Sequence, residues 1–210
     1  MSKFESDVRK NLIQAYNKSV DQREGRTISE WKMREREKFL RFLHENSVQT
    51  LIDVGCGPGI HAVYFRENGL RVTCVDLSPE MVARCTEKNF DAYVCDVVDL
   101  AALGKTFDAV FTMNSLLHVP RTQMIQVLKA IRDTLTQNGL FYWGQYGGEE
   151  WEGVREDDDY EPKRFFSFME DEKITQLAEE IFLLEEFTPV YLEDADSFHF
   201  QSLILRAKDR

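Results

Sequence analysis

The sequence predicts an α/β protein in which helices cover both faces of a mainly parallel, seven-stranded sheet. From Thr50 onward, short apolar runs alternate with amphipathic segments of helical period. The runs are apolar almost throughout, as in strands that are buried on both faces of a sheet. Glycines and acidic residues directly follow several of the runs, at the edge where open parallel sheets bind their ligands.

Five strands are expected first, and a closing pair of strands completes the sheet. The five cover residues 51–54, 71–76, 92–95, 107–111 and 140–143, and the closing pair covers residues 185–192 and 198–207. Helical patterns separate the first five runs. One of these helices has Ser78 as a suitable N-cap and Pro79 at its first position. Strands and helices in this alternation form a doubly wound sheet.

The segment before residue 47 differs because it shows no strand pattern. Its apolar residues recur at helical spacing, and Gly25 separates two helices. We therefore divide the chain into an N-terminal helical extension, residues 1–46, and a main domain, residues 47–210.

The composition is that of a folded protein with little attraction for polyanions. Asp and Glu number 37 against 26 Lys and Arg, a net charge of −11, which makes nucleic acid a poor partner. No apolar run reaches the length of a membrane span, and the first residues show no export signal. We therefore expect a cytoplasmic protein with reduced thiols. Its 4 Cys and 4 His show no metal-ligand spacing, so no metal site is expected.

The glycine-rich turn after the first strand is the most informative segment. It contains Gly55, Gly57 and Gly59, preceded by Asp53. Glycines allow positive φ angles and let the backbone approach a ligand closely. A dinucleotide site would have glycine at position 60, where this chain has Ile60, so a nicotinamide oxidoreductase is disfavoured.

With this turn, the chain resembles the class I S-adenosylmethionine (SAM)-dependent methyltransferases, in the small-molecule branch labelled type 11 or type 25. Four motifs carry the resemblance, in order: D-x-G-x-G-x-G at residues 53–59, the acid Asp76 with its D-x-S-x-x-M continuation, Asp96 after the third strand, and F-D-x-V at residues 107–110. The resemblance implies a Rossmann-like sheet of strand order 3-2-1-4-5-7-6 whose last strand is antiparallel, with residues 1–46 as a helical lid.

The resemblance also implies a cofactor site for SAM, with S-adenosylhomocysteine as the product. Asp76 would accept from the ribose hydroxyls, and its distance of 21 positions from Gly55 suits one intervening helix. The other cofactor-binding residues implied are Asp53, Gly55, Gly57, Leu77, Met81, Asp96, Val97, Asn114 and Tyr16. Of these, Asp53 would reach the amine of the methionine portion, and Asp96 the adenine amine. Asp108 is assigned to the scaffold.

Methyl transfer from a sulfonium requires alignment above all, so a general base is needed only for a protonated acceptor. His118 and Asn114, after the fourth strand, are the catalytic candidates. The alternative for His118 is packing under the cofactor or capping of the next helix. Asn114 equally suits a purely structural turn.

Aromatic residues are the candidates for the acceptor pocket. Tyr142, Trp143 and Tyr146 belong to the fifth strand, with Trp143 on the opposite face from the two tyrosines, and Trp31 belongs to the lid. Core packing is the alternative for each of them. Residues 149–161 hold eight carboxylates against Arg155 alone, which indicates either a solvated loop or attraction for a cationic acceptor. Lys163 and Arg164 would instead suit an anionic group.

The sequence thus predicts an enzyme that moves a methyl group from SAM to a small molecule by in-line displacement. A methyltransferase acting on a protein or tRNA group, and a SAM-binding module without catalysis, stay open as alternatives. The acceptor, the methylated atom and the oligomeric state are not indicated.

Overall fold

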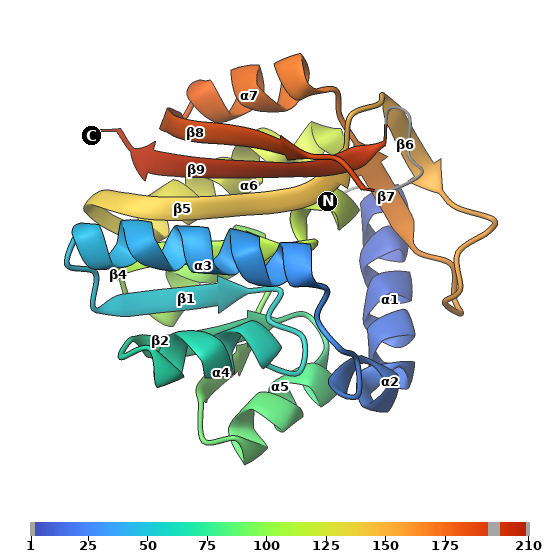
Figure 1. The fold of residues 1–210 in the computed structure, drawn as a ribbon. Helices are drawn as coiled ribbons and strands as arrows, with labels where there is room; N and C mark the ends of the chain where they lie inside the picture. The colour runs from blue at the N-terminus through green and yellow to red at the C-terminus, as the bar shows by residue number, and fades with distance from the viewer. Residues whose placement is uncertain (1–2, 193–197, 209–210) are drawn as a thin grey trace.

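The computed structural model describes residues 3–192 and 198–208. Its main sheet has seven strands in the order β3-β2-β1-β4-β5-β9-β8, and helices lie on both faces (Figure 1). The strands of this sheet are β1 (Thr50–Val54), β2 (Arg71–Asp76), β3 (Asp91–Val94), β4 (Phe107–Met113), β5 (Leu135–Gly147), β8 (Phe182–Val190) and β9 (His199–Ala207). The predicted fold class and strand order are confirmed, with β8 and β9 as the closing pair.

The first five strands of the sheet are parallel, so their carboxyl ends meet along one edge. β1 lies at the centre and pairs with β2 on one side and with β4 on the other. β9 then runs antiparallel between β5 and β8. The functional residues that follow β1, β2, β3 and β4 are therefore brought together by the topology.

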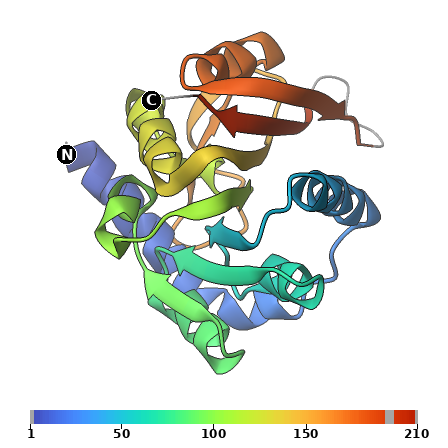
Figure 2. The same cartoon turned by 90° about the vertical axis from the view of Figure 1, so that its left-hand side faces the viewer.

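Each face of the sheet is covered by its own set of helices, as the turned view shows (Figure 2). The helices are α1 (Lys3–Lys18), α2 (Val20–Glu24), α3 (Glu30–Glu45), α4 (Ile60–Glu67), α5 (Pro79–Glu87), α6 (Arg121–Thr134) and α7 (Asp171–Glu179), with short 3-10 helices η1 (Val97–Leu103) and η2 (Leu116–His118). α3, α4 and α5 contribute Phe39, Phe65 and Cys85 to one apolar cluster. α6 and α7 contribute Ile131 and Ile174 to the other.

The two N-terminal helices have a different position from α3. α1 and α2 lie beside the end of the sheet to which the parallel strands point, next to the loop that precedes β7 (Figure 1). α3 packs on the sheet itself, where Phe39 and Leu43 are completely buried. The division of the chain at residue 46 stays a prediction.

The structure bears on the predictions for the acidic segment, for the end of one helix and for membrane-spanning segments. Part of the predicted acidic loop is a strand: β6 (Trp151–Val154) pairs with β7 (Phe165–Phe168) in a two-stranded ribbon, and Trp151 packs on Phe168 across it. The sequence also predicts that the helix after the fourth strand ends at Asn138 and Gly139. In the structure α6 ends at Thr134, and Leu135 already pairs with Phe107 of β4. Among the described residues, no helix combines the length and apolarity that crossing a bilayer requires.

Candidate active site

A cavity opens at the carboxyl ends of the first four strands and is covered by α1. Its lining includes eight of the predicted cofactor-binding residues: Tyr16, Gly55, Gly57, Asp76, Leu77, Asp96, Val97 and Asn114. The other two lie outside the lining. Asp53 is buried in β1, and Met81 is buried beneath the turn, where its amide donates to Ser78 Oγ.

The glycine turn is fixed to the neighbouring strand by its backbone. The amides of Gly55 and Cys56 both donate to the Val75 carbonyl, at 2.7 and 3.1 Å. Gly55 has a φ of 73°, and a Cβ at this position would overlap the side chain of Ser115. Gly55 therefore satisfies a conformational and a steric requirement at once.

Asp76 holds the turn and the next helix in place. Its Oδ2 accepts from the Gly57 amide and its Oδ1 from the Ser78 amide, both at 2.9 Å. Burial raises the pKa of Asp76, although these two bonds and Arg23 favour its charged form. Each carboxylate oxygen keeps a further lone pair for a ligand in the cavity.

Two residues that line the cavity carry a buried polar atom with no partner among the described residues: Arg23 through its Nε, a donor, and Asn114 through its Oδ1, an acceptor. Buried polar groups are rarely left unpaired, so these atoms indicate a ligand that accepts at one point and donates at another. The carboxylate and ammonium of the SAM amino-acid end match this pair. Asp53 Oδ2 also has no partner within the described residues, and burial raises the pKa of Asp53 well above its usual value.

Asp96 connects the lid to the end of β3. Its Oδ2 forms an ion pair with Arg9 of α1 at 2.5 Å, and its Oδ1 accepts from the Val98 amide. Asp96 lines the cavity, and its carboxylate already has these two partners. The contact with an adenine amine stays a prediction.

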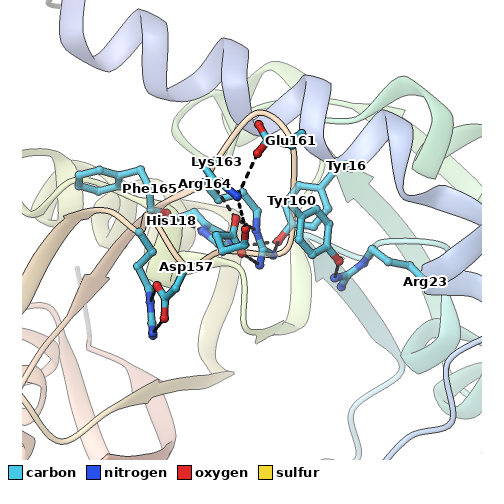
Figure 3. A network of polar contacts seen from close by, with 11 residues as sticks. Tyr16, Arg23, His118, Asp157, Tyr160, Glu161, Lys163, Arg164 and Phe165 are labelled. Carbon is cyan, nitrogen blue, oxygen red and sulfur yellow. Dashed lines mark hydrogen bonds and ion pairs between the residues drawn. The ribbon is translucent and has the colours of Figure 1, made fainter.

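His118 fastens Tyr16 of the lid to the ribbon (Figure 3). Its Nδ1 lies 2.7 Å from the Phe165 carbonyl and its Nε2 lies 2.7 Å from the Tyr16 hydroxyl. Because a carbonyl only accepts, Nδ1 carries the proton and Nε2 accepts from the tyrosine. Burial lowers the pKa of His118 to about 3, so the imidazole is a weak base. This geometry favours a positioning role.

Sequence reasoning missed most of the groups that surround this contact. Arg164 donates to the Tyr16 hydroxyl at 3.2 Å and forms an ion pair with Asp158 at 2.6 Å. Arg23 donates to the Tyr160 hydroxyl, and the guanidinium of Arg164 lies 3.6 Å from the centre of the Tyr160 ring (Figure 3). Only Arg164 carried a signal, as a cation next to the acidic segment. The name latch is used below for six side chains: Tyr16, Arg23, His118, Asp158, Tyr160 and Arg164.

A second compartment adjoins the cavity. Tyr16, Arg23, Gly55, Asn114 and His118 line both spaces and form the boundary between them. The second compartment extends to α3, α4 and the ribbon, and we call it the outer compartment. Its further lining consists of Arg26, Thr27, Ile28, Ser29, Lys32, Cys56, Pro58, Ile60, His61, Met113, Leu117, Tyr146, Arg164 and Phe166.

The four predicted acceptor-pocket aromatics have different positions. Tyr146 lines the outer compartment, and Trp31 packs against it with ring centres 6.0 Å apart. Tyr142 and Trp143 are completely buried in the two opposite core clusters, so they face opposite sides as expected. Tyr142 bonds to Ser202 and Trp143 to Gln145. Neither borders the cavity or the outer compartment, because their strand is covered by helices at that level.

Three buried cysteines lie beneath the glycine turn. The sulfurs of Cys56, Cys74 and Cys85 are all within 4.8 Å of one another. Thiols are soft-metal ligands, but Cys56 and Cys85 here both donate to the Gly57 carbonyl at 3.4 Å and support the turn from below. The expectation of no metal site stays a prediction.

Replacing His118 by glutamine is expected to change how stability depends on pH. The folded state disfavours a proton on His118, whose pKa is lowered to about 3 by burial, while the unfolded chain takes one up near pH 6.5. Acidification from pH 7 to pH 5 should therefore lower the free energy of unfolding of the native protein by about 2 kcal/mol more than that of the glutamine variant. Urea unfolding at the two pH values measures this. Parallel losses in both proteins would contradict the buried, neutral imidazole.

Comparison with known proteins agrees with this geometry. Residues 51–139 match the model of a methyltransferase domain family. A ubiquinone biosynthesis O-methyltransferase of Xanthomonas campestris is 35% identical over 99 residues, which are 44% of this chain and 41% of that protein. The glycine N-methyltransferase of Oryctolagus cuniculus is 29% identical over 124 residues, 49% of this chain and 42% of that protein. The chain thus spans less than half the length of these curated relatives.

Solved structures show the same fold over more of the chain. The 1,6-didemethyltoxoflavin-N1-methyltransferase of Burkholderia thailandensis, with its namesake ligand and S-adenosylhomocysteine bound, has a TM-score of 0.74 at 20% identity, covering 99% of this chain and 90% of that one. The N-methyltransferase NodS of Bradyrhizobium japonicum, in complex with S-adenosylhomocysteine, has a TM-score of 0.67 at 14% identity, covering 93% and 100%. Residues 51–139 therefore match a methyltransferase domain family, and the seven-stranded sheet built around them has the fold of these solved methyltransferases.

Proposed function

We propose that this protein transfers the methyl group of SAM to a small-molecule acceptor. The observation that carries the proposal is a single cavity in which the glycine turn, Asp76 and Asn114 converge beneath a helical lid. The glycine turn and Asp76 belong to the motifs that predict SAM, and Asn114 is among the other cofactor-binding residues that the resemblance implies. Two of the matched proteins act, by their names, on small molecules, namely glycine and 1,6-didemethyltoxoflavin.

Each region of the cavity suits one part of the cofactor. Asp76 would bind the ribose hydroxyls, while Asp96 and Val97 would face the adenine. Arg23 and Asn114 would bind the carboxylate and ammonium through their unpartnered atoms. Leu77 adds an apolar surface, and Met81 supports the turn from within the core.

The boundary between the two spaces is where the reaction would take place. Bound SAM supplies an electrophilic methyl group on a sulfonium, which needs neither covalent nor metal activation. The chain's own task is alignment in line with the departing sulfur, and this is worth several kcal/mol, on the order of 7–11 in well-oriented reactions. Asn114 and Tyr16 line both spaces and would orient the acceptor, while His118 holds Tyr16.

The lid and the latch would exclude water from this boundary. α1 covers the cavity and is attached through Arg9 to Asp96 and through Tyr16 to His118. Water exclusion strengthens the polar contacts on which alignment depends.

Calorimetry followed by a labelling experiment tests the proposal. We expect SAM and S-adenosylhomocysteine to bind and NAD to give no heat above dilution. With labelled SAM, we expect the label in the small-molecule fraction of a cell extract. Label in the protein or RNA fraction would favour the corresponding alternative acceptor. SAM binding with no incorporation into any fraction would leave a non-catalytic binding module, and NAD binding would overturn the proposal.

A further inference from the structure

The outer compartment has a charge opposite to that of the whole protein. Four cationic side chains line it, namely Arg23, Arg26, Lys32 and Arg164, and no Asp or Glu of the described residues belongs to its lining. The chain as a whole has a net charge of −11. A cationic concavity in an acidic protein concentrates anions locally.

Two of the four cations have no acidic partner among the residues the structure describes. Arg164 is paired with Asp158, and Arg23 faces Asp76 and the cofactor cavity. Arg26 and Lys32 take part in none of the ion pairs within residues 3–192 and 198–208. Their charges are therefore not neutralised by an ion pair within the described residues.

The acidic residues next to these two cations in the sequence are engaged elsewhere. Glu24 pairs with Lys88 at 2.7 Å and with Arg84 at 3.3 Å, on the side of α5. Glu30 lies 3.7 Å from Arg34 on the outer surface of α3. The local acids therefore leave the charges of Arg26 and Lys32 uncompensated.

The ammonium of Lys32 is destabilised by burial and by the neighbouring positive charges. Its ammonium is partly buried 5.2 Å from the Trp31 ring centre and 5.8 Å from that of Tyr146. Burial, and then the charges of Arg23 and Arg26, lower the pKa of Lys32. A bound anion would relieve this repulsion, and hydrogen bonds to a charged group are about twice as strong as neutral ones.

The rest of the compartment is apolar and aromatic. Ile60, Met113, Leu117, Tyr146 and Phe166 line it alongside a neutral imidazole, since burial lowers the pKa of His61 to about 3. Phe166 and Tyr146 offer ring faces and edges to a flat ligand. His61 Nδ1, buried and unpartnered among the described residues, adds a polar contact.

The carboxylates of the segment 149–161 do not neutralise the cations of the outer compartment that lack an acidic partner among the described residues. Asp158 pairs with Arg164, Asp157 with Arg155, and Glu150 with Arg121 and Lys173. None of them lines the outer compartment. The outer compartment therefore offers a cationic acceptor no carboxylate from this segment.

We propose that the acceptor is a small aromatic acid whose carboxylate binds Arg26 and Lys32 while its ring lies among the aromatic side chains of the outer compartment. This assignment rests on the proposed function, because it places the acceptor beside the boundary at Asn114 and Tyr16. The carboxylate fixes the orientation, and the opposite end of the ring system presents the atom to be methylated.

Binding of simple probes tests the charge preference without turnover. Protein saturated with S-adenosylhomocysteine is titrated by NMR with benzoate, benzamide and benzylammonium, which share a ring and differ in charge. We expect benzoate to bind at least about tenfold more tightly than either of the others. A difference below about twofold, including the absence of detectable binding by all three, would overturn the proposal.

Three variants locate the preference. Lys32→Met and Arg26→Gln should each reduce benzoate affinity by about five- to tenfold and leave benzamide affinity unchanged. Arg34→Gln is the matched control, because it removes a positive charge from α3 outside the compartment. If all three variants reduced benzoate affinity equally, general charge rather than this site would be responsible, and the assignment would fail.

The product of the labelling experiment gives a second test and separates the two proposals. A labelled product retained on an anion exchanger at pH 7 supports the aromatic acid, and a neutral or cationic product overturns it while the methyltransferase proposal stands. If SAM itself does not bind, the proposed function fails first. Phenyl phosphate binding in preference to benzoate would replace the carboxylate by a phosphate.

Discussion

Replacement of Asp76 by alanine is expected to weaken SAM binding by roughly tenfold to a hundredfold, measured by calorimetry. We propose that Asp76 accepts from the ribose hydroxyls, and leaving such buried groups unpaired costs about 1–3 kcal/mol. The structure adds a second cause, because Asp76 also accepts from the amides of Gly57 and Ser78. The turn and the start of α5 would lose their shared anchor.

Two further variants of the same type make this result interpretable. Asp76→Asn keeps one acceptor oxygen and should lose less affinity than the alanine variant. Asp91→Ala removes an exposed carboxylate paired with Lys105 and should leave SAM affinity unchanged. An Asp76→Ala protein that binds SAM as the native protein does would show that the ribose lies elsewhere.

Gly55→Ala should have the second large effect, on both stability and cofactor binding. The residue has a φ of 73°, which costs an L-residue about 1–2 kcal/mol. The added Cβ would also overlap Ser115, whose hydroxyl donates to the Val54 carbonyl. Displacement of either segment changes the wall of the cavity. We expect the free energy of unfolding to fall by about 2 kcal/mol or more, and SAM to bind at least tenfold more weakly.

Gly69→Ala separates these two causes. Gly69 has a φ of 90° but nothing within 4 Å of an added Cβ, so only the conformational cost applies. It should lower the free energy of unfolding by about 1 kcal/mol and leave SAM affinity intact. Equal losses in the two variants, measured by urea unfolding, would contradict the steric role of Ser115.

The parts of the site that the sequence predicts are those set by local chemistry. The glycine turn and Asp96 lie just after strands and Asp76 is the last residue of one, and parallel topology then places the ends of neighbouring strands together. Their positions around one cavity therefore follow from the strand pattern alone. The outcome for Asp53 differs, because β1 turns its side chain into the interior rather than into the lining.

The parts that could not be predicted depend on contacts between distant segments. Arg23 and Tyr160 are 137 positions apart, and their hydrogen bond forms only because α2 and the loop between β6 and β7 meet beyond the carboxyl ends of the parallel strands. No periodicity indicates such a pair. Tyr142 shows the converse limit: alternation predicted its face, but not that Ser202 and core packing would enclose it.

The place of β9 has a consequence for the synthesis of this protein. Residues 199–207 are translated after the other strands of the sheet, yet they pair with β5 on one side and β8 on the other. Until they leave the ribosome, both partners expose unpaired edges, which are the usual starting points of aggregation. A nascent chain of this protein is therefore prone to aggregate until residues 199–207 have been synthesised and can pair with β5 and β8.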